Sequence, residues 1–142
     1  MIVADSSYIV EGVLADKSLL MGDLILAPDL AVYETAGAIW KHQALLGRIR
    51  DGRRYLSTLS ELIRTNSLLT TMPDKEAIDA AYDLALRYHS HPHDTVFVAI
   101  ALRTGLDLKT FDSEQREIYD RERALRIGPA NRGPEPGKGK RT

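Results

Sequence analysis

Four acidic residues stand where the expected strands and helices could bring carboxylates together. Asp5 and Asp112 each directly follow a short apolar run that is expected to form a buried strand. Asp94 lies in the first turn of a predicted helix, and Glu34 lies early in another. Ligands of open parallel sheets bind beyond the carboxyl ends of the strands. The four side chains could therefore converge at one edge of a sheet.

Such a convergence would have definite chemical consequences. Carboxylates that approach one another raise each other's pKa unless a positive charge lies among them. Oxygen ligands without His or Cys select Mg²⁺ or Mn²⁺, which keep bound waters and engage substrate phosphates. The pattern therefore predicts metal-assisted phosphodiester chemistry, with a metal-activated water as the nucleophile.

Each acid taken alone also has an ordinary structural explanation. Asp5 could cap the first helix, and the helix dipole favours an acid at the position of Asp94. Asp112 is a common turn residue, and Glu34 could be a solvated helix acid. The combination of the four is more specific than any one of them.

Short apolar runs alternate with longer segments of helical periodicity. We expect strands at 2–4, 24–26, 68–69, 106–111 and 125–127, and helices at 8–15, 30–43, 53–64, from 73–74 onward, 92–105 and 113–121. This alternation predicts an α/β fold around a mainly parallel sheet.

Composition and charge favour one domain followed by a short tail. The chain has 142 residues, of which 44% are hydrophobic and 27% charged. Residues 128–142 hold four bases, one acid, four Gly and three Pro, so we expect a flexible basic tail after a domain at 1–127. That domain carries 15 bases and 19 acids, which excludes a surface that is basic overall but leaves room for a local basic patch.

The chain shows no feature of an exported or membrane protein. It contains no cysteine, which permits a reducing compartment. Its first residues lack the pattern of a signal peptide, and no apolar run approaches the roughly 18 residues that cross a bilayer. We therefore expect a cytoplasmic protein without a membrane partner.

Four motifs in this order resemble a known family. The segments IVADSSYIV, YETAGAIWK, HPHDTVFVAIAL and LKTFD are similar to motifs of the PIN-domain ribonucleases, particularly the VapC-type toxins of prokaryotic toxin–antitoxin pairs. The resemblance covers about residues 1–127. It implies a Rossmann-like sheet of about five parallel strands and an endoribonuclease that depends on Mg²⁺ or Mn²⁺.

The resemblance also implies roles for individual residues. By position, the family's acidic quartet corresponds to Asp5, Glu34, Asp94 and Asp112. Asp5, Asp94 and Asp112 would be metal ligands, and Glu34 would be a ligand or a base that orients water. Ser6 and Thr110 match hydroxyl residues that would orient carboxylates or water.

The same resemblance implies partners and products. The substrates would be structured RNAs with single-stranded loops, cleaved to leave a 5′-phosphate and a 3′-hydroxyl. An antitoxin protein and a homodimer are expected. Tyr33 and Trp40 could pack in the core or at a partner surface, and an antitoxin would lay an apolar segment across a groove.

Several basic residues allow two interpretations. Arg48 and Arg50, with Arg53 and Arg54, could grip RNA phosphates or form the solvated start of a helix, and Lys41 is a further candidate RNA contact. Lys109 replaces an apolar residue in the last motif, which suggests an exposed strand end or a lysine that faces phosphate.

His89, His91 and His93 form an HxHxH run. An extended chain would place all three on one side and could hold zinc or nickel. The alternative is a polar loop that enters a helix.

Other functions fit the sequence less well but remain open. A PIN domain could act in RNA processing without an antitoxin, or the domain could bind RNA or protein without catalysis. A receiver-like phosphoacceptor would leave Asp94 and Asp112 unexplained. A phosphatase of the haloacid dehalogenase type needs an aspartate where Ser7 stands.

Overall fold

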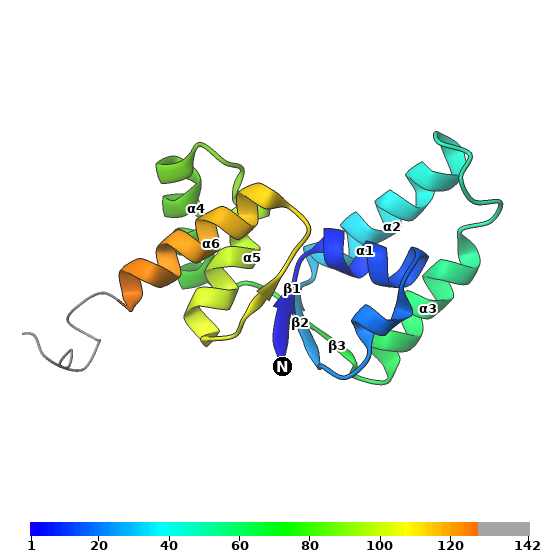
Figure 1. Cartoon of the computed structure of the whole chain (residues 1–142), viewed down its shortest axis with the longest axis horizontal. Helices are drawn as coiled ribbons and strands as arrows, with labels where there is room; N and C mark the ends of the chain where they lie inside the picture. The colour runs from blue at the N-terminus through cyan, green and yellow to red at the C-terminus, as the bar shows by residue number, and fades with distance from the viewer. Residues whose placement is uncertain (128–142) are drawn as a thin grey trace, which may run out of the picture.

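The structure, a computed structural model, describes residues 1–127, and the predicted tail at 128–142 lies outside the described residues. Strands and helices alternate along this part of the chain (Figure 1). In order they are β1 (Ile2–Ala4), α1 (Ser6–Leu14), the 3₁₀ helix η1 (Lys17–Leu20), β2 (Ile25–Pro28), α2 (Leu30–Ala44), α3 (Arg53–Arg64), β3 (Leu68–Thr71), α4 (Lys75–Tyr88), α5 (Pro92–Thr104), β4 (Leu108–Lys109) and α6 (Ser113–Arg126).

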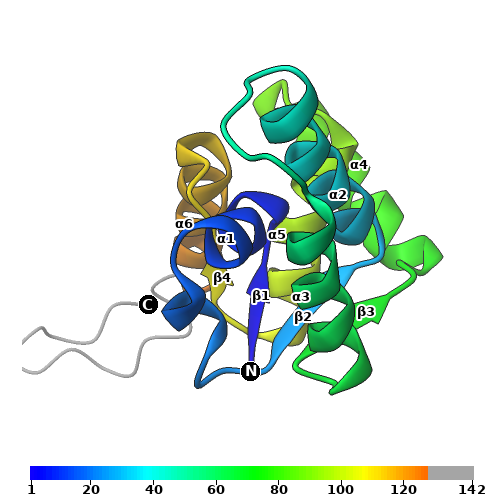
Figure 2. The same cartoon turned by 90° about the vertical axis from the view of Figure 1, so that its right-hand side faces the viewer.

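The strands form one parallel sheet between two layers of helices. The strand order is β3-β2-β1-β4, and all three neighbouring pairs are parallel. Helices α1, α2 and α3 lie on one side of the sheet, and α4, α5 and α6 lie on the other (Figures 1 and 2). All three residues of β1 are buried, as expected for a central strand covered on both faces. The predicted α/β architecture is confirmed.

Residues at the helix ends explain where the helices that carry the candidate acids begin and end. Asp5 caps α1 by accepting a hydrogen bond from the amide of Tyr8, and Asp112 caps α6 in the same way. Pro92 occupies the first turn of α5, where its missing N–H costs nothing. Gly105 ends α5 with φ +71°, a left-handed conformation that glycine adopts without strain.

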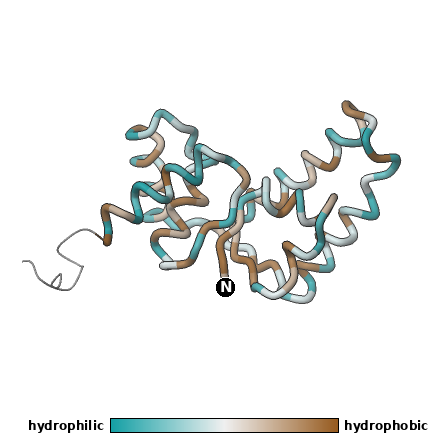
Figure 3. The backbone as a smooth tube through the Cα atoms, in the orientation of Figure 1, coloured by the Kyte–Doolittle hydropathy of each residue, from teal (hydrophilic) through white to brown (hydrophobic). Residues whose placement is uncertain are grey.

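The hydrophobic core is centred on α5. Residues 95–101 of this helix are buried without interruption, and Phe97 is among the largest fully buried side chains. The helix contacts β1, β2 and β4 on one side and α4 and α6 on the other. Hydrophobic colour is concentrated along β1 in Figure 3, which agrees with its position against this helix. Helix α5 is thus the element that fixes the sheet relative to the outer helices.

The C-terminal end of the described chain differs from the prediction. The strand expected at 125–127 is wrong, because α6 continues through Arg126 rather than ending near Arg121. Leu125 is 71% exposed, so this apolar residue is not a buried strand residue. Within residues 1–127 the sheet therefore has four strands instead of about five. The strand expected at 106–111 is also shorter, at Leu108–Lys109.

None of the helices between residues 1 and 127 is both long enough and apolar enough to span a lipid bilayer.

Candidate active site

The order of the strands reverses between β1 and β4. The chain progresses outward from β1 through β2 to β3, and then returns to place β4 on the opposite side of β1. In doubly wound sheets, ligands bind where the strand order reverses, outside the carboxyl ends of the strands. Asp5 follows β1, and Asp112 lies three residues after β4. Both acids therefore flank the position where this topology forms a site.

Asp5 is buried and held by three hydrogen bonds. Its residue is 2% exposed. Oδ1 accepts from the Ser7 hydroxyl at 2.6 Å and from the Tyr8 amide at 3.1 Å, and Oδ2 accepts from the Thr110 hydroxyl at 2.6 Å. These contacts fix the orientation of the Asp5 carboxylate.

Thr110 connects the ends of β1 and β4. While its hydroxyl donates to Asp5, the same oxygen accepts a hydrogen bond from the Asp112 amide at 2.9 Å. Asp112 in turn uses Oδ1 to accept from the amides of Glu114 and Gln115. One threonine therefore sets the position of the first acid and of the backbone that carries the last.

Ser7 is a second residue whose hydroxyl holds the Asp5 carboxylate, and it was not among the predicted site residues. Its oxygen donates to Asp5 and accepts from the amide of Phe111 at 3.0 Å. Ser6, which the sequence analysis did select, lies instead by Glu34, where its hydroxyl lowers the pKa of that carboxyl. One signal in the sequence could have pointed to Ser7. When an aspartate caps a helix, as Asp5 does, the hydroxyl of a serine two residues later can donate to its carboxylate.

Glu34 and Asp94 are partly buried and electrostatically coupled. Burial raises the pKa of Glu34 above its ordinary value of 4.5, against the opposing effects of Ser6 and His93. The charges of Asp94 and Asp5 raise the pKa of Glu34 further. Burial also raises the pKa of Asp94 above 3.8, and His93 acts in the opposite direction.

These couplings link the four predicted acids pair by pair. Glu34 lies within electrostatic range of Asp5 and Asp94, and the charge of Asp112 raises the pKa of Asp94. Glu114, which the sequence analysis did not consider, has the same effect on Asp94. The predicted elements thus bring one acid from each of four segments to a single edge of the sheet.

The donor set suits a hard divalent cation. All four side chains offer carboxylate oxygens, and Glu34 Oε1 is buried without a hydrogen-bond partner among residues 1–127. A buried oxygen of this kind is costly unless a ligand satisfies it. As the side chains stand, no three His, Asp or Glu residues of the described chain have the spacing that would hold a metal ion. The assignment of Asp5, Asp94 and Asp112 as metal ligands stays a prediction.

The candidate RNA contacts lie away from the acids. Lys41 is exposed in the last turn of α2, and Arg48 and Arg50 are exposed in the segment between α2 and α3. Because α2 begins near the acidic edge and is about 22 Å long, these bases stand at its far end (Figure 1). Arg53 pairs with Asp51 at 3.3 Å. The role of Lys41, Arg48 and Arg50 in RNA binding stays a prediction.

The HxHxH run does not have the extended geometry that a three-histidine site would need. His89 ends α4 in the left-handed conformation with φ 52°, while His93 already belongs to α5. The rings of His91 and His93 stack with centroids 5.1 Å apart. This geometry agrees with the alternative of a polar segment that leads from the end of α4 into α5.

Lys109 pairs with Asp107, with 3.5 Å between Nζ and Oδ2. This contact agrees with an exposed strand end rather than a lysine directed at phosphate.

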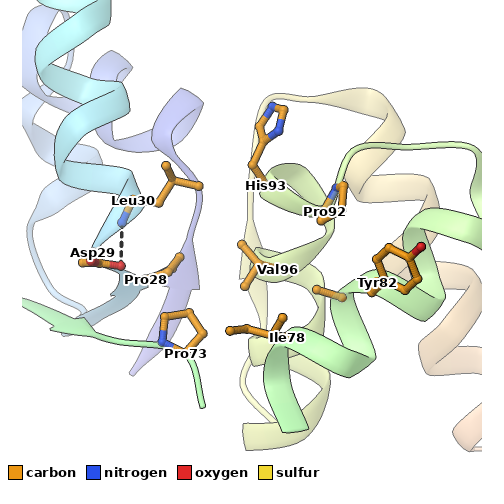
Figure 4. Close-up of a pocket in the computed structure, with 10 residues that line it drawn as sticks. Pro28, Asp29, Leu30, Pro73, Ile78, Tyr82, Pro92, His93 and Val96 are labelled. Atoms are coloured by element: carbon orange, nitrogen blue, oxygen red, sulfur yellow. Dashed lines mark hydrogen bonds between the residues drawn. The ribbon is translucent and has the colours of Figure 1, made fainter. Parts of the chain in front are cut away.

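Two grooves lie along helix α2. The first, of about 250 Å³, lies between the start of α2 and helices α4 and α5; Figure 4 shows Ile78 and Val96 opposite Pro73 and Pro28. His93 also lines this cavity. Apart from His93, Tyr82 and the helix cap Asp29, its lining offers no titratable group.

The second groove, of about 320 Å³, lies between α2 and α3 and is lined in part by Ile39, Trp40 and Leu56. Trp40 is 59% exposed, and Tyr33 is exposed as well. The alternative that these aromatic residues pack in the core is therefore wrong.

Comparison with known proteins agrees with this geometry. The family model described as the PIN domain matches residues 2–121, a range that includes all four acids. Ribonuclease VapC3 from Pyrobaculum aerophilum is similar to the chain, with 30% identity over 105 residues. The aligned part covers 74% of this chain and 79% of that relative.

Proposed function

This chain belongs to the PIN-domain family, and we propose that it is an endoribonuclease that requires Mg²⁺ or Mn²⁺. The observation that carries this proposal is the convergence of Asp5, Glu34, Asp94 and Asp112 at the carboxyl edge of the sheet, with a buried Glu34 oxygen that has no partner in the described chain. The similarity to a ribonuclease supports RNA as the substrate.

In this proposal the acids bind the cation and the attacking water, and two hydroxyl residues hold Asp5 in place. Asp5, Asp94 and Asp112 would hold the cation through carboxylate oxygens, and Glu34 would orient the attacking water or add a ligand. When bound, the cation would supply a water of lowered pKa and neutralise charge on the phosphate. Ser7 and Thr110 would keep the Asp5 carboxylate in place, as their hydrogen bonds do in the structure.

An assay of metal dependence and product ends tests this proposal. A structured RNA with single-stranded loops should be cleaved in Mg²⁺ or Mn²⁺ and remain intact in excess EDTA. The fragments should carry 5′-phosphate and 3′-hydroxyl ends. Cleavage that persists in EDTA, or fragments with 2′,3′-cyclic phosphates, would contradict a metal-activated water as the nucleophile.

We further propose that the protein is the toxin of a type II toxin–antitoxin pair in the cytoplasm. The groove between α2 and α3, with its exposed Trp40, suits an apolar antitoxin segment. Expression alone should arrest growth, and co-expression of a small neighbouring gene should relieve the arrest. Growth that is unaffected by an RNA-cleaving chain would favour a PIN-domain nuclease of RNA processing instead.

We infer that a second copy binds to α4. Ile78, Tyr82 and Leu86 recur at every fourth position, form one stripe along this helix and are all exposed. Sedimentation should show a dimer for the natural chain and a monomer for Tyr82→Lys. A monomeric natural chain would contradict this assignment.

A further inference from the structure

A pair of stacked aromatic rings lies beside the four acids. The ring centroids of Tyr8 and Phe111 are 5.6 Å apart, and the ring planes differ by 18°. Tyr8 is partly buried, and its hydroxyl donates to the carbonyl of Leu19 at 3.1 Å. Phe111 is 61% exposed. Tyr8 thus supports one face of the Phe111 ring and leaves the opposite face open to solvent.

The backbone of Phe111 is tied to the Asp5 carboxylate. Its amide donates to Ser7 Oγ at 3.0 Å, and the same oxygen donates to Asp5 Oδ1 at 2.6 Å. Its neighbours in the chain are Thr110, which also bonds Asp5, and the candidate ligand Asp112. Only two hydrogen bonds separate the Phe111 backbone from Asp5, so its side chain starts from the acidic edge.

The basic residues nearest to Phe111 in the sequence already have partners within the fold. Lys109 of β4 and Arg116 of α6 both lie within ion-pair distance of Asp107, at 3.5 and 3.8 Å. Arg116 also bonds the carbonyl of Leu108 at 2.8 Å. These two basic side chains are therefore engaged within the fold. Stacking of a nucleobase on an aromatic ring needs no charged side chain, and it accepts any nucleobase because each has a π-face.

We propose that Phe111, supported by Tyr8, stacks against an unpaired nucleobase of the RNA next to the phosphodiester that is cleaved. The inference rests on the proposed ribonuclease function and adds a binding residue to it. A base inside a duplex has both faces covered by its neighbours, so this contact selects single-stranded loops. Phe111 therefore contributes substrate affinity and strand selection, while the carboxylates carry out the chemistry.

Fluorescence of a labelled RNA tests the contact directly. The probe is an RNA hairpin with 2-aminopurine at each loop position in turn, bound to the Asp94→Asn variant so that it is not cleaved. At one position, stacking on Phe111 should quench the fluorophore. Adding Phe111→Leu, which keeps an apolar side chain but removes the ring, should abolish that quenching and weaken binding about five- to one-hundred-fold. Phe111→Trp should restore both.

Leu125→Ala is the matched control. Leu125 is an apolar residue even more exposed than Phe111, near the other end of α6 and about 20 Å along that helix from Asp112. Its loss should leave quenching and affinity unchanged. An equal effect of Leu125→Ala and Phe111→Leu would overturn the inference, because any exposed apolar residue would then serve. Circular dichroism checks that each variant is folded.

Cleavage by the natural chain separates this inference from the function on which it rests. If the natural chain cleaves the hairpin in Mg²⁺ and Phe111→Leu binds and quenches as before, the stacking contact is wrong and the ribonuclease assignment stands. If the natural chain does not cleave the hairpin and the Asp94→Asn variant does not bind it, both are wrong.

Discussion

The Asp5 carboxylate takes part in both the local structure of α1 and the candidate site. Oδ1 accepts from the Tyr8 amide as a helix cap, and Oδ2 is left for Thr110 on the neighbouring strand connection. The capping and catalytic explanations of this residue are therefore compatible. A substitution at Asp5 would disturb the helix and the site together, so Asp94, which is not a cap residue, gives the cleaner test of function.

The hydroxyl of Thr110 should be needed for cleavage. Thr110→Val keeps the shape of the side chain but removes its bonds to Asp5 and to the Asp112 amide. We expect a loss of about 10- to 100-fold in RNA cleavage, the usual cost of removing a group that orients a metal ligand. Thr110→Ser retains the hydroxyl and should remain close to the natural rate. Equal rates for Thr110→Val and the natural chain would show that Asp5 needs no such support.

The raised pKa values of Glu34 and Asp94 predict how stability depends on pH without divalent cations. A carboxyl whose pKa is raised by folding stabilises the fold fully below its unfolded pKa, and this contribution is lost as the pH rises through the folded pKa. Glu34→Gln and Asp94→Asn should therefore raise the melting temperature at about pH 7 and give a smaller gain at about pH 4, where the natural carboxyls already bind protons.

Thermal melts in EDTA at the two pH values measure this effect. Asp83→Asn, on the exposed surface of α4, is the control and should show no gain at either pH. A gain for Asp94→Asn that is larger at the lower pH would reverse the predicted sign.

At the residue scale, the sequence was sufficient to find the four acids but not their partners. An acid that directly follows an apolar run can be recognised without a structure, because strand ends meet at one edge of a parallel sheet. The bond from Thr110 to Asp5 joins residues 105 positions apart and depends on the register of β1 with β4. The burial of Glu34 Oε1 depends on packing across helices, which no local pattern encodes.

At the scale of elements, α5 carries Asp94 into the site and must be fixed against its neighbours. Thr95 is fully buried, and its hydroxyl donates to the carbonyl of Ala81 in α4 at 2.6 Å. Thr95→Val should lower the free energy of unfolding by about 1–3 kcal/mol, because the isosteric side chain loses this buried hydrogen bond.

Chemical denaturation compares this variant with Thr104→Val. The Thr104 hydroxyl bonds only carbonyls of its own helix, at Ile100 and Ala101, and the residue is exposed. We expect a change below about 0.5 kcal/mol there. Equal effects at the two positions would mean that the contact with Ala81 does not hold α5 in place.

Elements with clear periodicity or strong end signals were predicted well, and short elements with neither were not. The helix at 53–64 was predicted with the bounds that the structure gives, and Pro92 and Gly105 marked the limits of α5. The strand expected at 125–127 failed because two apolar residues on either side of Arg126 fit a short strand and a helix end equally well. Within residues 1–127 no strand pairs with Leu125, and the exposure of this residue decides for the helix.

At the scale of the whole molecule, the charge distribution is consistent with an enzyme that reaches phosphates through a cation. The chain is nearly neutral, yet residues 1–127 carry more acids than bases, and several of these acids converge at one edge. Mutual repulsion of the carboxylates should destabilise this edge until a cation binds. Binding of Mg²⁺ to the native state should therefore raise the free energy of unfolding, by about 2.7 kcal/mol when the Mg²⁺ concentration is a hundred times Kd. The melting temperature should rise with it.

The thermal shift is measured with Mg²⁺ and, as a control for ionic strength, with matched NaCl. Asp94→Asn should lose most of the shift. A shift of the same size in NaCl, or in Asp94→Asn, would place the effect of Mg²⁺ outside the acidic edge.

The most direct test of the acidic edge is the rate of Mg²⁺-dependent RNA cleavage by Asp94→Asn and by Asp74→Asn, measured beside the natural chain. Asp74 is also an acid at the start of a helix, but it serves as the cap of α4 and lies outside the quartet. We predict that folded Asp94→Asn does not cleave detectably and that Asp74→Asn cleaves at the natural rate. Full cleavage by Asp94→Asn would contradict the account.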